Sequence, residues 1–395
     1  MKFNKFNLLH YFIFIFSLIL NLAVIPIAFI PKNNKRNKTI VLYGHKFYGN
    51  IKSIYESKKI INAEVYFLTL DKKYYSQLKK EISNVLYGLN FFHLIKVVRT
   101  EIFICDHGLH FFKLFMVLNK TIFIDTNHGL PFHKDAFYKM NYYKNFNEVW
   151  IMSDFHKQLF YDFNYKGSNL NVTGYGRLDN LIIFNSLNKY QKNIEIKKIK
   201  KSYDFDFEKI ILLAPTWVHD KKILIDSGYP FNKSEFYENL NNFCNKNNSL
   251  LIYRPHLNDI LPNEIFKKIK NLNNIKIMGL KDFPATEDFL KVADILITDW
   301  SSISIDFLAL DKPVLFINSP NPFKFGALNI ELLRFGEIVN KDNINEKISD
   351  YLKDKNNYFK NNKQHKKIKS LFLDIGLDGK STLRYVKIIN NYLKS

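Results

Sequence analysis

The sequence predicts an α/β protein with two parallel-sheet domains, for three reasons. Short, continuous apolar runs recur along the chain, as is typical of strands buried on both faces of a parallel sheet. Segments with helical patterns separate these runs, and alternating strands and helices favour a parallel sheet. A charged, Lys-rich stretch over residues 185–209 divides the strands into two series, and we interpret it as the linker to a second domain.

An apolar run over residues 8–30 precedes the first domain and is long enough to span a bilayer. Its apolar core is too long for a signal peptide, and no A-x-A site follows it. A buried core helix is a third interpretation. Basic residues flank the run on both sides: Lys2 and Lys5 before it, and Lys32, Lys35, Arg36 and Lys38 after it. The positive-inside rule then predicts one span of the inner (cytoplasmic) membrane with the body cytoplasmic. A helix lying along the inner leaflet is the alternative.

The first domain is predicted from about Thr39 to Phe184. Its expected strands are Thr39–Tyr43, Val65–Leu70, Glu101–Asp106, Thr121–Asp125 and Val149–Met152, and a helix is expected over Lys72–Tyr87. His128 lies in a Gly- and Pro-containing turn after the fourth strand, and a histidine there indicates loop chemistry. A later glycine turn, residues 174–179, carries Arg177 and Asp179.

The second domain is predicted to begin with a strand over Lys209–Ala214. Further strands are expected at Asn248–Tyr253 and Ile275–Met278, and helices at Asn345–Tyr358 and Ser381–Tyr392. A β-α-β unit over residues 293–317 is the most informative stretch, because Ser301 and Ser302 stand at its strand-to-helix turn. Ligands of open α/β sheets bind at the carboxyl ends of strands, and a helix N-terminus suits a phosphate. The alternative is that both serines only cap the helix.

The composition favours an anionic partner and a reducing compartment. The formal charge is +21 over 395 residues, which suits a phospholipid surface, nucleic acid or a phosphate-rich polymer. An AT-rich genome also raises the Lys and Asn content, so charge alone identifies none of these. The two cysteines, Cys105 and Cys244, have neither disulfide-framework nor zinc-site spacing. The sequence contains no P-loop, no strand-linked G-x-G-x-x-G, no H-E-x-x-H and no evident nucleic-acid-binding motif.

Histidines and arginines follow predicted strands in both domains. His128 and His256 each lie in a turn with a proline, and Arg254 directly precedes the second of these turns. A neutral histidine can act as a general base near pH 7, and a cation can stabilise charge on a phosphate leaving group. A purely structural role for either histidine is the alternative.

Together these motifs resemble the CDP-glycerol glycerophosphotransferase family, whose members prime or polymerise teichoic acids and related capsular polyol-phosphate polymers. The matching motifs are His128-Gly129-Leu130-Pro131 with Lys134, Gly174-Tyr175-Gly176-Arg177-Leu178-Asp179, Ala214-Pro215-Thr216-Trp217, Arg254-Pro255-His256, Thr298-Asp299-Trp300-Ser301-Ser302 with Asp306 and Lys312-Pro313, and Asp378-Gly379-Lys380-Ser381. They lie in the family's order over most of the chain.

The resemblance implies a GT-B-like fold, with two Rossmann-like domains that face a central cleft. The implied ranges are 1–38 for a membrane anchor with its basic flank, 39–190 for the acceptor-side domain and 200–395 for the CDP-alcohol-binding domain. The implied reaction is attack of an acceptor hydroxyl on the glycerol-linked phosphorus of CDP-glycerol, with release of CMP. The CDP-alcohol is a co-substrate; no cofactor and no metal ligands are implied, and a need for a divalent ion stays open. The implied acceptor is a lipid-linked or polymer hydroxyl, and the membrane is the implied partner rather than nucleic acid.

The resemblance also assigns roles to residues. His128 is the implied general base, and His256 with Ser301 and Ser302 would hold the pyrophosphate of the donor. The other implied substrate-binding residues are Gly129, Lys134, Arg177, Asp179, Thr216, Arg254, Thr298, Asp299 and Asp306. Local capping is the alternative role for Asp299 and Asp306.

Several positions depart from the family pattern and leave the polyol open between glycerol, ribitol and another alcohol. Gly176 replaces a Pro, Trp300 replaces a Tyr, Val218 and Leu257 stand where Arg and Pro are usual, and His133 takes the place of the first Lys. Two rival functions remain: a GT-B glycosyltransferase or epimerase that uses a nucleotide sugar, and a non-catalytic membrane protein that binds an anionic polymer.

Overall fold

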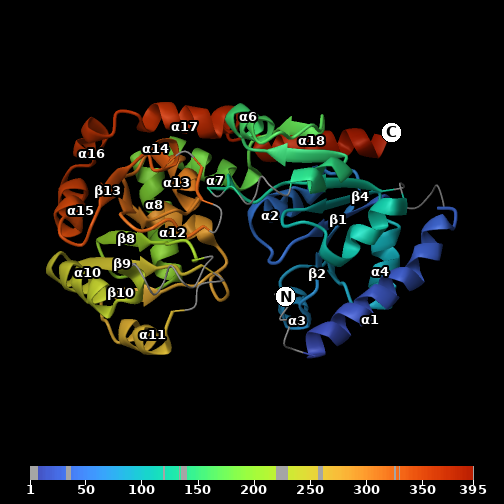
Figure 1. Cartoon of the computed structure of the whole chain (residues 1–395), viewed down its shortest axis with the longest axis horizontal. Helices are drawn as coiled ribbons and strands as arrows, with labels where there is room; N and C mark the ends of the chain where they lie inside the picture. Colours follow the sequence, from blue (N-terminus) through green and yellow to red (C-terminus); the bar gives the residue numbers. More distant parts are fainter. Residues whose placement is uncertain are drawn as a thin grey trace. The chain divides into compact units, whose positions relative to one another are not determined.

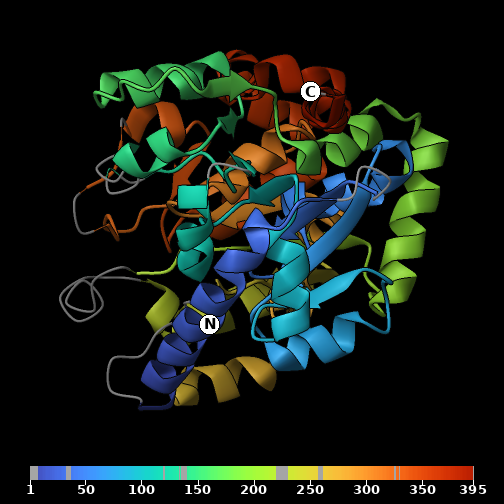
Figure 2. The ribbon, with the colours of Figure 1, turned by 90° about the vertical axis from the view of Figure 1, so that its right-hand side faces the viewer.

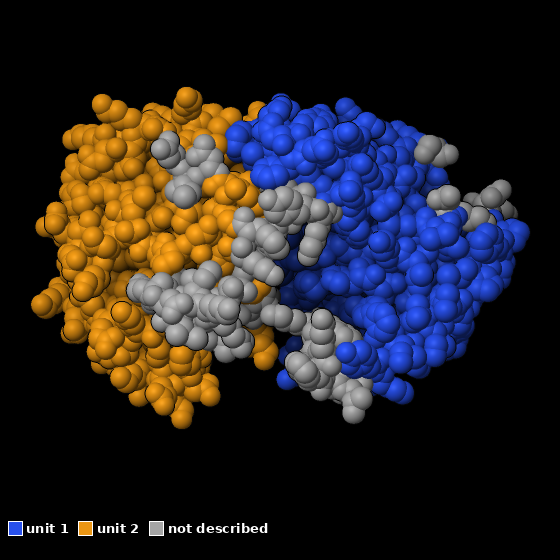
Figure 3. Space-filling model, viewed as in Figure 1, with its two compact units in different colours: residues 1–128, 140–179, 378–395 blue, residues 129–139, 180–377 orange. Residues whose placement is uncertain are grey.

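The chain forms two compact α/β units in a computed structural model (Figure 1). The structure describes residues 8–32, 37–118, 121–132, 134, 140–218, 230–256, 261–323, 326–328 and 330–394. Unit 1 comprises residues 1–128, 140–179 and 378–395, and unit 2 comprises residues 129–139 and 180–377 (Figure 3). The α/β fold class with two parallel sheets is therefore confirmed.

Unit 1 contains a parallel seven-stranded sheet in the order β3-β2-β1-β4-β5-β6-β7. The strands are β1 (Thr39–Tyr43), β2 (Glu64–Thr69), β3 (Val85–Tyr87), β4 (Ile102–Cys105), β5 (Ile122–Asp125), β6 (Glu148–Ile151) and β7 (Leu170–Val172). The helices are α1 (Leu8–Val24), α2 (Gly49–Glu56), α3 (Lys72–Leu78), α4 (Phe91–Val98), α6 (Asp154–Asp162) and α18 (Ser381–Lys394), with the 3₁₀ segments η1 (Ile25–Phe29) and η3 (His110–Leu118) beside them. The central strands β1 and β4 are wholly buried, as their apolar runs require.

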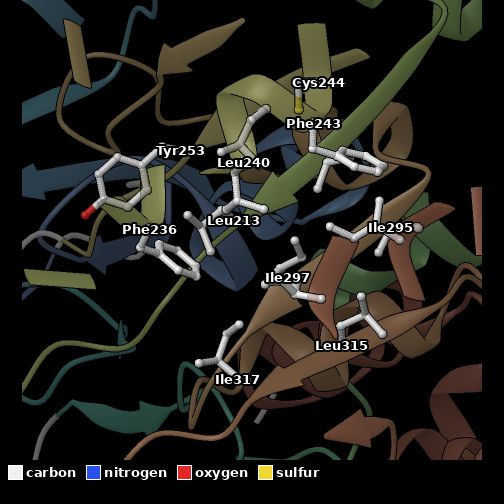
Figure 4. Close-up of a cluster of buried hydrophobic side chains, with 14 of the residues drawn as sticks. Leu213, Phe236, Leu240, Phe243, Cys244, Tyr253, Ile295, Ile297, Leu315 and Ile317 are labelled. Carbon is white, nitrogen blue, oxygen red and sulfur yellow. The ribbon is translucent and has the colours of Figure 1, made fainter. Parts of the chain in front are cut away.

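Unit 2 contains a parallel six-stranded sheet in the order β10-β9-β8-β11-β12-β13. Its strands are β8 (Lys209–Leu213), β9 (Ser249–Tyr253), β10 (Ile275–Ile277), β11 (Ile295–Thr298), β12 (Val314–Ile317) and β13 (Glu337–Val339). Its helices are α8 (Lys189–Ser202), α10 (Ser234–Lys246), α11 (Asn263–Lys270), α12 (Thr286–Val292), α13 (Ile303–Leu308), α14 (Ile330–Leu333), α15 (Ile344–Lys353), α16 (Lys355–Asn361) and α17 (His365–Leu373). Figure 4 shows part of the apolar core, where side chains of β8, β9, β11 and β12 meet those of α10.

Both sheets have the same strand order, which in each unit reads 3-2-1-4-5-6 from one edge. In this order the chain moves in opposite directions from the first and fourth strands, so a crevice forms beyond their carboxyl ends. The two switch points lie between β1 and β4 in unit 1 and between β8 and β11 in unit 2. A ligand site is therefore expected at the loops that follow these strands.

Four local predictions need correction. The helix expected over Lys72–Tyr87 ends at Leu78, and its last residues form strand β3. The expected linker over 185–209 is largely helix α8, which begins with a capping box between Asn188 and Gln191. The helix expected over Asn345–Tyr358 is two helices, because Asp354 ends the first and caps the second. The apolar run over 8–30 is not one α-helix, since a 3₁₀ segment follows α1 from Ile25, with Pro26 in its first turn.

The units also differ from the ranges that the resemblance implied. Residues 129–139 belong to unit 2, although they lie between strands of unit 1. Helix α18 returns to unit 1, where it packs against α2 and contributes Tyr385, Val386, Ile389 and Leu393 to the core. The chain passes between the units within helix α7 (Gly176–Ser186) and again near residue 377.

Candidate active site

Three neighbouring strands of unit 1 end in loops that bring imidazole rings together. His45 follows β1, His107 follows β4 and His128 follows β5. The ring centroids of His107 and His128 are 4.2 Å apart and nearly parallel, and that of His45 is 4.9 Å from His107. His110, at the start of η3, lies 5.2 Å from His45. We call these four residues, with Asp106, the histidine cluster.

The hydrogen bonds of His128 fix its tautomer. Its Nδ1 lies 3.0 Å from the backbone carbonyl oxygen of Asp106, and a carbonyl only accepts. The neutral ring therefore carries its proton on Nδ1 and leaves Nε2 as an acceptor. Desolvation lowers the pKa of His128 below its ordinary value, and the neighbouring His107 lowers it further, so the ring is neutral at pH 7. The residue itself keeps an exposed surface. These are the properties of a general base.

Asp106 contacts the cluster through the ring of His107. Its Oδ1 lies 2.7 Å from His107 Nδ1, and its side chain is only 4% exposed. Burial raises the pKa of the Asp106 carboxyl to about 7, against the opposing effects of His128 and His45. Burial likewise lowers the pKa of His107 to about 4. His107 is therefore neutral near pH 7, while Asp106 changes its charge in that range.

The remaining rings of the cluster are also held neutral. Burial lowers the pKa of His45 to about 4, and the repulsion of His107 adds to this effect. The Tyr43 hydroxyl lies 3.1 Å from Nδ1 of His110. Among the residues that the structure describes, no group of three or more His, Cys, Asp or Glu side chains is arranged to hold a metal ion.

Arg177 lies where the sequence predicted a substrate contact, directly against His128. Its Nη1 donates to the carbonyl oxygen of His128 at 2.6 Å, and its backbone N–H donates to Asn50 Oδ1 at 3.2 Å. The Asn50 amide also donates to the carbonyls of Thr126 and Asn127, at 3.2 and 3.1 Å. Asn50 and Arg177 therefore hold the His128 turn in place from two directions.

Asp179 has a structural role in this fold. Its two carboxylate oxygens accept the backbone N–H groups of Ser381 and Thr382, at 3.0 and 2.7 Å, so it caps helix α18. Gly176 has a steric role beside it, since an added Cβ would lie 2.4 Å from the Ser53 hydroxyl. Its N–H also donates to the Tyr385 hydroxyl, which a proline could not do. The departure from Pro at this position thus follows from packing.

Unit 2 brings polar residues together at the ends of β8, β9 and β11. Asp299 is buried, and its Oδ1 accepts the backbone N–H of Thr216 at 2.7 Å. Burial raises the pKa of the Asp299 carboxyl to about 7, and its Oδ2 has no hydrogen-bond partner among the described residues. The carboxylate therefore ties two strand ends together instead of capping a helix. His256 follows β9 on an exposed turn. Its ring stacks on that of Trp217, with the two ring centroids 6.1 Å apart.

The two serines after β11 differ in what they bind locally. The Ser301 hydroxyl lies 3.5 Å from the Ile303 N–H, at the limit of a hydrogen bond, and Ser302 at the N-cap makes no capping bond with its side chain. Both residues are partly exposed. Helix capping therefore does not account for the two hydroxyls. Asp306 lies in the first turn of the same short helix.

Arg254 and Thr298 face the protein interior. The Arg254 guanidinium donates to the carbonyls of Met278 and Phe283, at 2.8 and 3.0 Å, and to the Thr286 hydroxyl at 2.7 Å. Thr298 donates to the carbonyl of Ala214 at 2.7 Å. The structure thus gives both residues local structural partners, and the substrate contacts that the resemblance implied stay a prediction.

Two further predicted residues, Gly129 and Lys134, belong to unit 2 with the rest of residues 129–139. The Lys134 backbone N–H donates to the carbonyl of Gly326 at 3.1 Å, and the Leu328 backbone N–H donates to the carbonyl of Phe132 at 2.9 Å. The motif that begins with His128 therefore changes units directly after this residue. His133, Leu257 and residues 135–139 lie outside the described part of the chain.

The sequence missed Arg334, a buried cation near the end of β12. It lies over the Trp300 ring at 4.8 Å and donates to the Ile317 carbonyl at 2.6 Å, while its Nε has no partner among the described residues. Trp300 Nε1 donates in turn to Ser319 O at 3.2 Å. Trp300 thus packs under a cation, which gives its departure from Tyr a structural reason.

The sequence also missed Asp106, His107 and His45, although one signal was present. The run Asp106-His107-Gly108-Leu109 after β4 has the same pattern as Asn127-His128-Gly129-Leu130 after β5. Because adjacent parallel strands end at the same edge of a sheet, a repeated x-His-Gly-Leu run indicates two rings side by side. The adjacency of β4 and β5 had to be known first.

Comparison with known proteins identifies relatives over most of the chain. The family model described as CDP-Glycerol:Poly(glycerophosphate) glycerophosphotransferase matches residues 27–390. The teichoic acid poly(glycerol phosphate) polymerase of Bacillus spizizenii is 34% identical over 148 residues, which is 36% of this chain and 34% of the relative. The teichoic acid ribitol-phosphate polymerase TarL of Staphylococcus aureus is 30% identical over 109 residues, 28% of this chain and 18% of the relative. The matched region thus spans 34% and 18% of the length of these relatives.

A solved structure extends the similarity in fold to nearly the whole chain. The wall teichoic acid polymerase TagF superposes with a TM-score of 0.71 and 15% identity, covering 97% of this chain and 98% of that chain. At this identity the likeness concerns the fold, and the expected GT-B-like class of two Rossmann-like units is confirmed.

Proposed function

Because the chain belongs to the CDP-glycerol:poly(glycerophosphate) glycerophosphotransferase family, we propose that it transfers a polyol phosphate from a CDP-activated alcohol to a hydroxyl acceptor. The proposed transferred group is glycerol phosphate, and the proposed leaving product is CMP. The group would be added to a teichoic-acid-like or capsular polymer. The observation that carries the proposal is the bond from His128 Nδ1 to the Asp106 carbonyl, which leaves Nε2 as the acceptor that this reaction requires.

In the proposed mechanism, unit 1 activates the acceptor. Its hydroxyl oxygen attacks the phosphorus that carries the glycerol, and its proton passes to Nε2 of neutral His128. The new P–O bond forms as the bond to the bridging oxygen of CDP breaks, and CMP leaves with that electron pair. The imidazolium so formed lies near the Asp106 carboxylate, whose negative charge stabilises the positive charge.

Unit 2 supplies the donor contacts in this proposal. The Ser301 and Ser302 hydroxyls and the exposed His256 imidazole bind the pyrophosphate, and Arg334 adds a fixed positive charge behind the Trp300 ring. Positioning and charge stabilisation do most of the work in phosphoryl transfer, so hydroxyls and cations are suited to it. We therefore propose that the protein needs no cofactor besides its CDP-alcohol co-substrate. Comparing CMP release in EDTA and in Mg²⁺ tests this part.

We further propose that the protein works at the inner membrane on a lipid-linked or polymer acceptor. The apolar N-terminal segment supports the location, since the stretch Tyr11–Phe29 has a mean hydropathy of 2.6 and is long and apolar enough to cross a membrane. The formal charge of +21 suits the anionic leaflet. The name of one relative includes glycerol phosphate and that of another includes ribitol phosphate, so both polyols remain candidates.

The decisive experiment measures CMP release by the purified protein with CDP-glycerol, CDP-ribitol and a UDP-sugar, each with a polyol-phosphate acceptor. We expect CMP from one CDP-alcohol, and its loss in His128→Asn. His93→Asn is the control, because His93 lies on α4 and contacts Tyr87 and Tyr75 away from the cluster. Turnover of the UDP-sugar alone would support the nucleotide-sugar enzyme. Polymer binding without turnover, unchanged in His128→Asn, would support the non-catalytic protein.

A further inference from the structure

His107 has a hydrogen-bond arrangement that parallels that of His128, although the proposed reaction uses only Nε2 of His128. The Nδ1 atom of His107 lies 2.7 Å from Oδ1 of the buried Asp106 carboxyl, and Nδ1 of His128 lies 3.0 Å from the backbone carbonyl oxygen of the same residue. An ionised carboxylate accepts and cannot donate, so above pH 7 the neutral His107 ring carries its proton on Nδ1. Each of the two rings therefore keeps Nε2 as an acceptor.

The two rings form a pair of parallel acceptors in the loops after β4 and β5. Their centroids are 4.2 Å apart, and their planes differ by 13°. Because Asp106 holds Nδ1 of both rings, their Nε2 atoms lie on matching edges. His128 is exposed and the His107 side chain is 20% exposed, so a ligand can reach both. Figure 2 shows α1 and α4 side by side on unit 1, while the pair follows strands at their carboxyl ends, where ligands of open α/β sheets bind.

The spacing of the pair fits two neighbouring hydroxyl groups better than one. A single hydroxyl has one proton to donate, so it satisfies one ring. Hydroxyls on adjacent carbons of a polyol chain can satisfy both rings, with hydrogen bonds of about 2.8 Å to acceptors whose rings are 4.2 Å apart. Burial lowers the pKa of His107 to about 4 and that of His128 to about 3, so both rings are neutral and suit an uncharged diol. The charge of Arg177 acts on both rings and suits the phosphate next to such a diol.

We propose that His107 and His128 together bind the end of an open-chain polyol phosphate acceptor through two hydroxyls on adjacent carbons. This inference rests on the proposed function and names the class of its acceptor. The terminal hydroxyl gives its proton to Nε2 of His128 as its oxygen attacks the phosphorus of the donor. The neighbouring hydroxyl donates a hydrogen bond to Nε2 of His107 and keeps its proton. His107 is thus a specificity-determining residue, and Asp106 positions it.

The first test compares two soluble acceptors above pH 7, with CDP-glycerol as the donor. One acceptor ends in glycerol phosphate, which has two adjacent hydroxyls, and the other ends in 3-hydroxypropyl phosphate, which lacks the second hydroxyl. The kcat/KM for CMP release should favour the glycerol end roughly 3- to 10-fold, which corresponds to one neutral hydrogen bond. In His107→Phe, which keeps an aromatic ring beside His128 but has no acceptor atom, the ratio of the two kcat/KM values should fall to about one.

His93→Phe is the matched control for this ratio. Its imidazole lies on α4 and accepts the Tyr87 backbone N–H at 2.9 Å, so the ratio should equal that of the wild type. A wild-type ratio near one, or a ratio that His107→Phe retains, would overturn the diol site and leave His107 as a ring that only packs on His128. Absence of CMP with both acceptors would contradict the proposed function, so the two failures are distinguishable.

The second test needs neither turnover nor a variant. It uses the full-length wild-type protein with isotope-labelled histidine nitrogens and follows their NMR signals during titration with each acceptor, in the absence of CDP-glycerol. Glycerol phosphate should shift the Nε2 signals of two histidines, whereas 3-hydroxypropyl phosphate should shift that of one. A shift in fewer than two histidines with glycerol phosphate would overturn the proposal, whatever the rate of CMP release.

Discussion

The two units share one strand order but carry different chemistry at the same position in it. At the switch point of unit 1, the strand ends hold four imidazoles and a carboxylate whose pKa lies near 7. Near the switch point of unit 2 lie the hydroxyls of Ser301 and Ser302 after β11, the exposed His256 after β9, and the buried Arg334, which contacts the end of β12. The first set suits proton transfer and the second suits the binding of phosphate. The difference shows that the fold sets where a site lies, while the loop residues decide what it does.

The largest expected effect separates proton transfer from donor binding. His128→Asn should lower kcat about 10²- to 10⁴-fold, because Nε2 of His128 is the atom proposed to take the acceptor proton. The affinity for CDP-glycerol, measured by calorimetry, should stay unchanged, since the proposed donor contacts belong to unit 2. A parallel loss of donor affinity would contradict this division of roles.

The reverse effect is expected in unit 2. Ser301→Ala combined with Ser302→Ala removes two hydrogen bonds to a charged ligand, each worth about 1.5–3 kcal/mol. The Kd for CDP-glycerol should rise roughly 10²- to 10⁴-fold if the two losses add, and the pH profile of kcat should keep its shape. Ser304→Ala is the control, because its hydroxyl already donates to the Ser301 carbonyl at 2.9 Å. Similar donor affinity in both variants would exclude the serines from the donor site.

The pH dependence sharpens the assignment of Asp106. Its carboxyl has a pKa near 7, and its ionised form raises the pKa of His128 and so favours the imidazolium. The rate should therefore rise as the pH passes upward through about 7. In Asp106→Asn the charge is absent at every pH, so this rise should disappear and the rate above pH 7 should fall about tenfold. A rise that persists in Asp106→Asn would assign the titration to another group.

The smallest expected effect concerns Asp179, which resemblance alone places in the substrate site. Asp179→Ala should cost about 1–2 kcal/mol of unfolding free energy through loss of the α18 cap, with donor affinity unchanged. Asp71→Ala, which removes an exposed cap of α3 with one bond at 3.0 Å, should cost less. Denaturant unfolding compares the two, and a raised Kd for CDP-glycerol in Asp179→Ala would restore the binding role.

Sequence patterns predicted the long buried strands and missed features that depend on topology. β1, β8 and β9 read clearly as apolar runs, whereas β3 and β7 have three residues each and carry too little pattern. The sequence did not indicate that Arg254 donates to two carbonyls and the Thr286 hydroxyl, or that Asp179 accepts backbone N–H groups of α18, because these partners are distant in sequence. The stacking of His107 on His128 depends on β4 lying beside β5, which no local pattern encodes.

The place of α18 in unit 1 has a consequence for how the protein is made. Tyr385, which stacks on Trp150 with ring centroids 4.4 Å apart, and Val386, Ile389 and Leu393 complete a core whose other buried members come from the first half of the chain. The ribosome therefore synthesises all of unit 2 before the first unit has its final helix. Folding of unit 1 during translation should halt at an incomplete core, and a premature stop anywhere in unit 2 should leave the base-bearing unit unfinished and open to proteolysis.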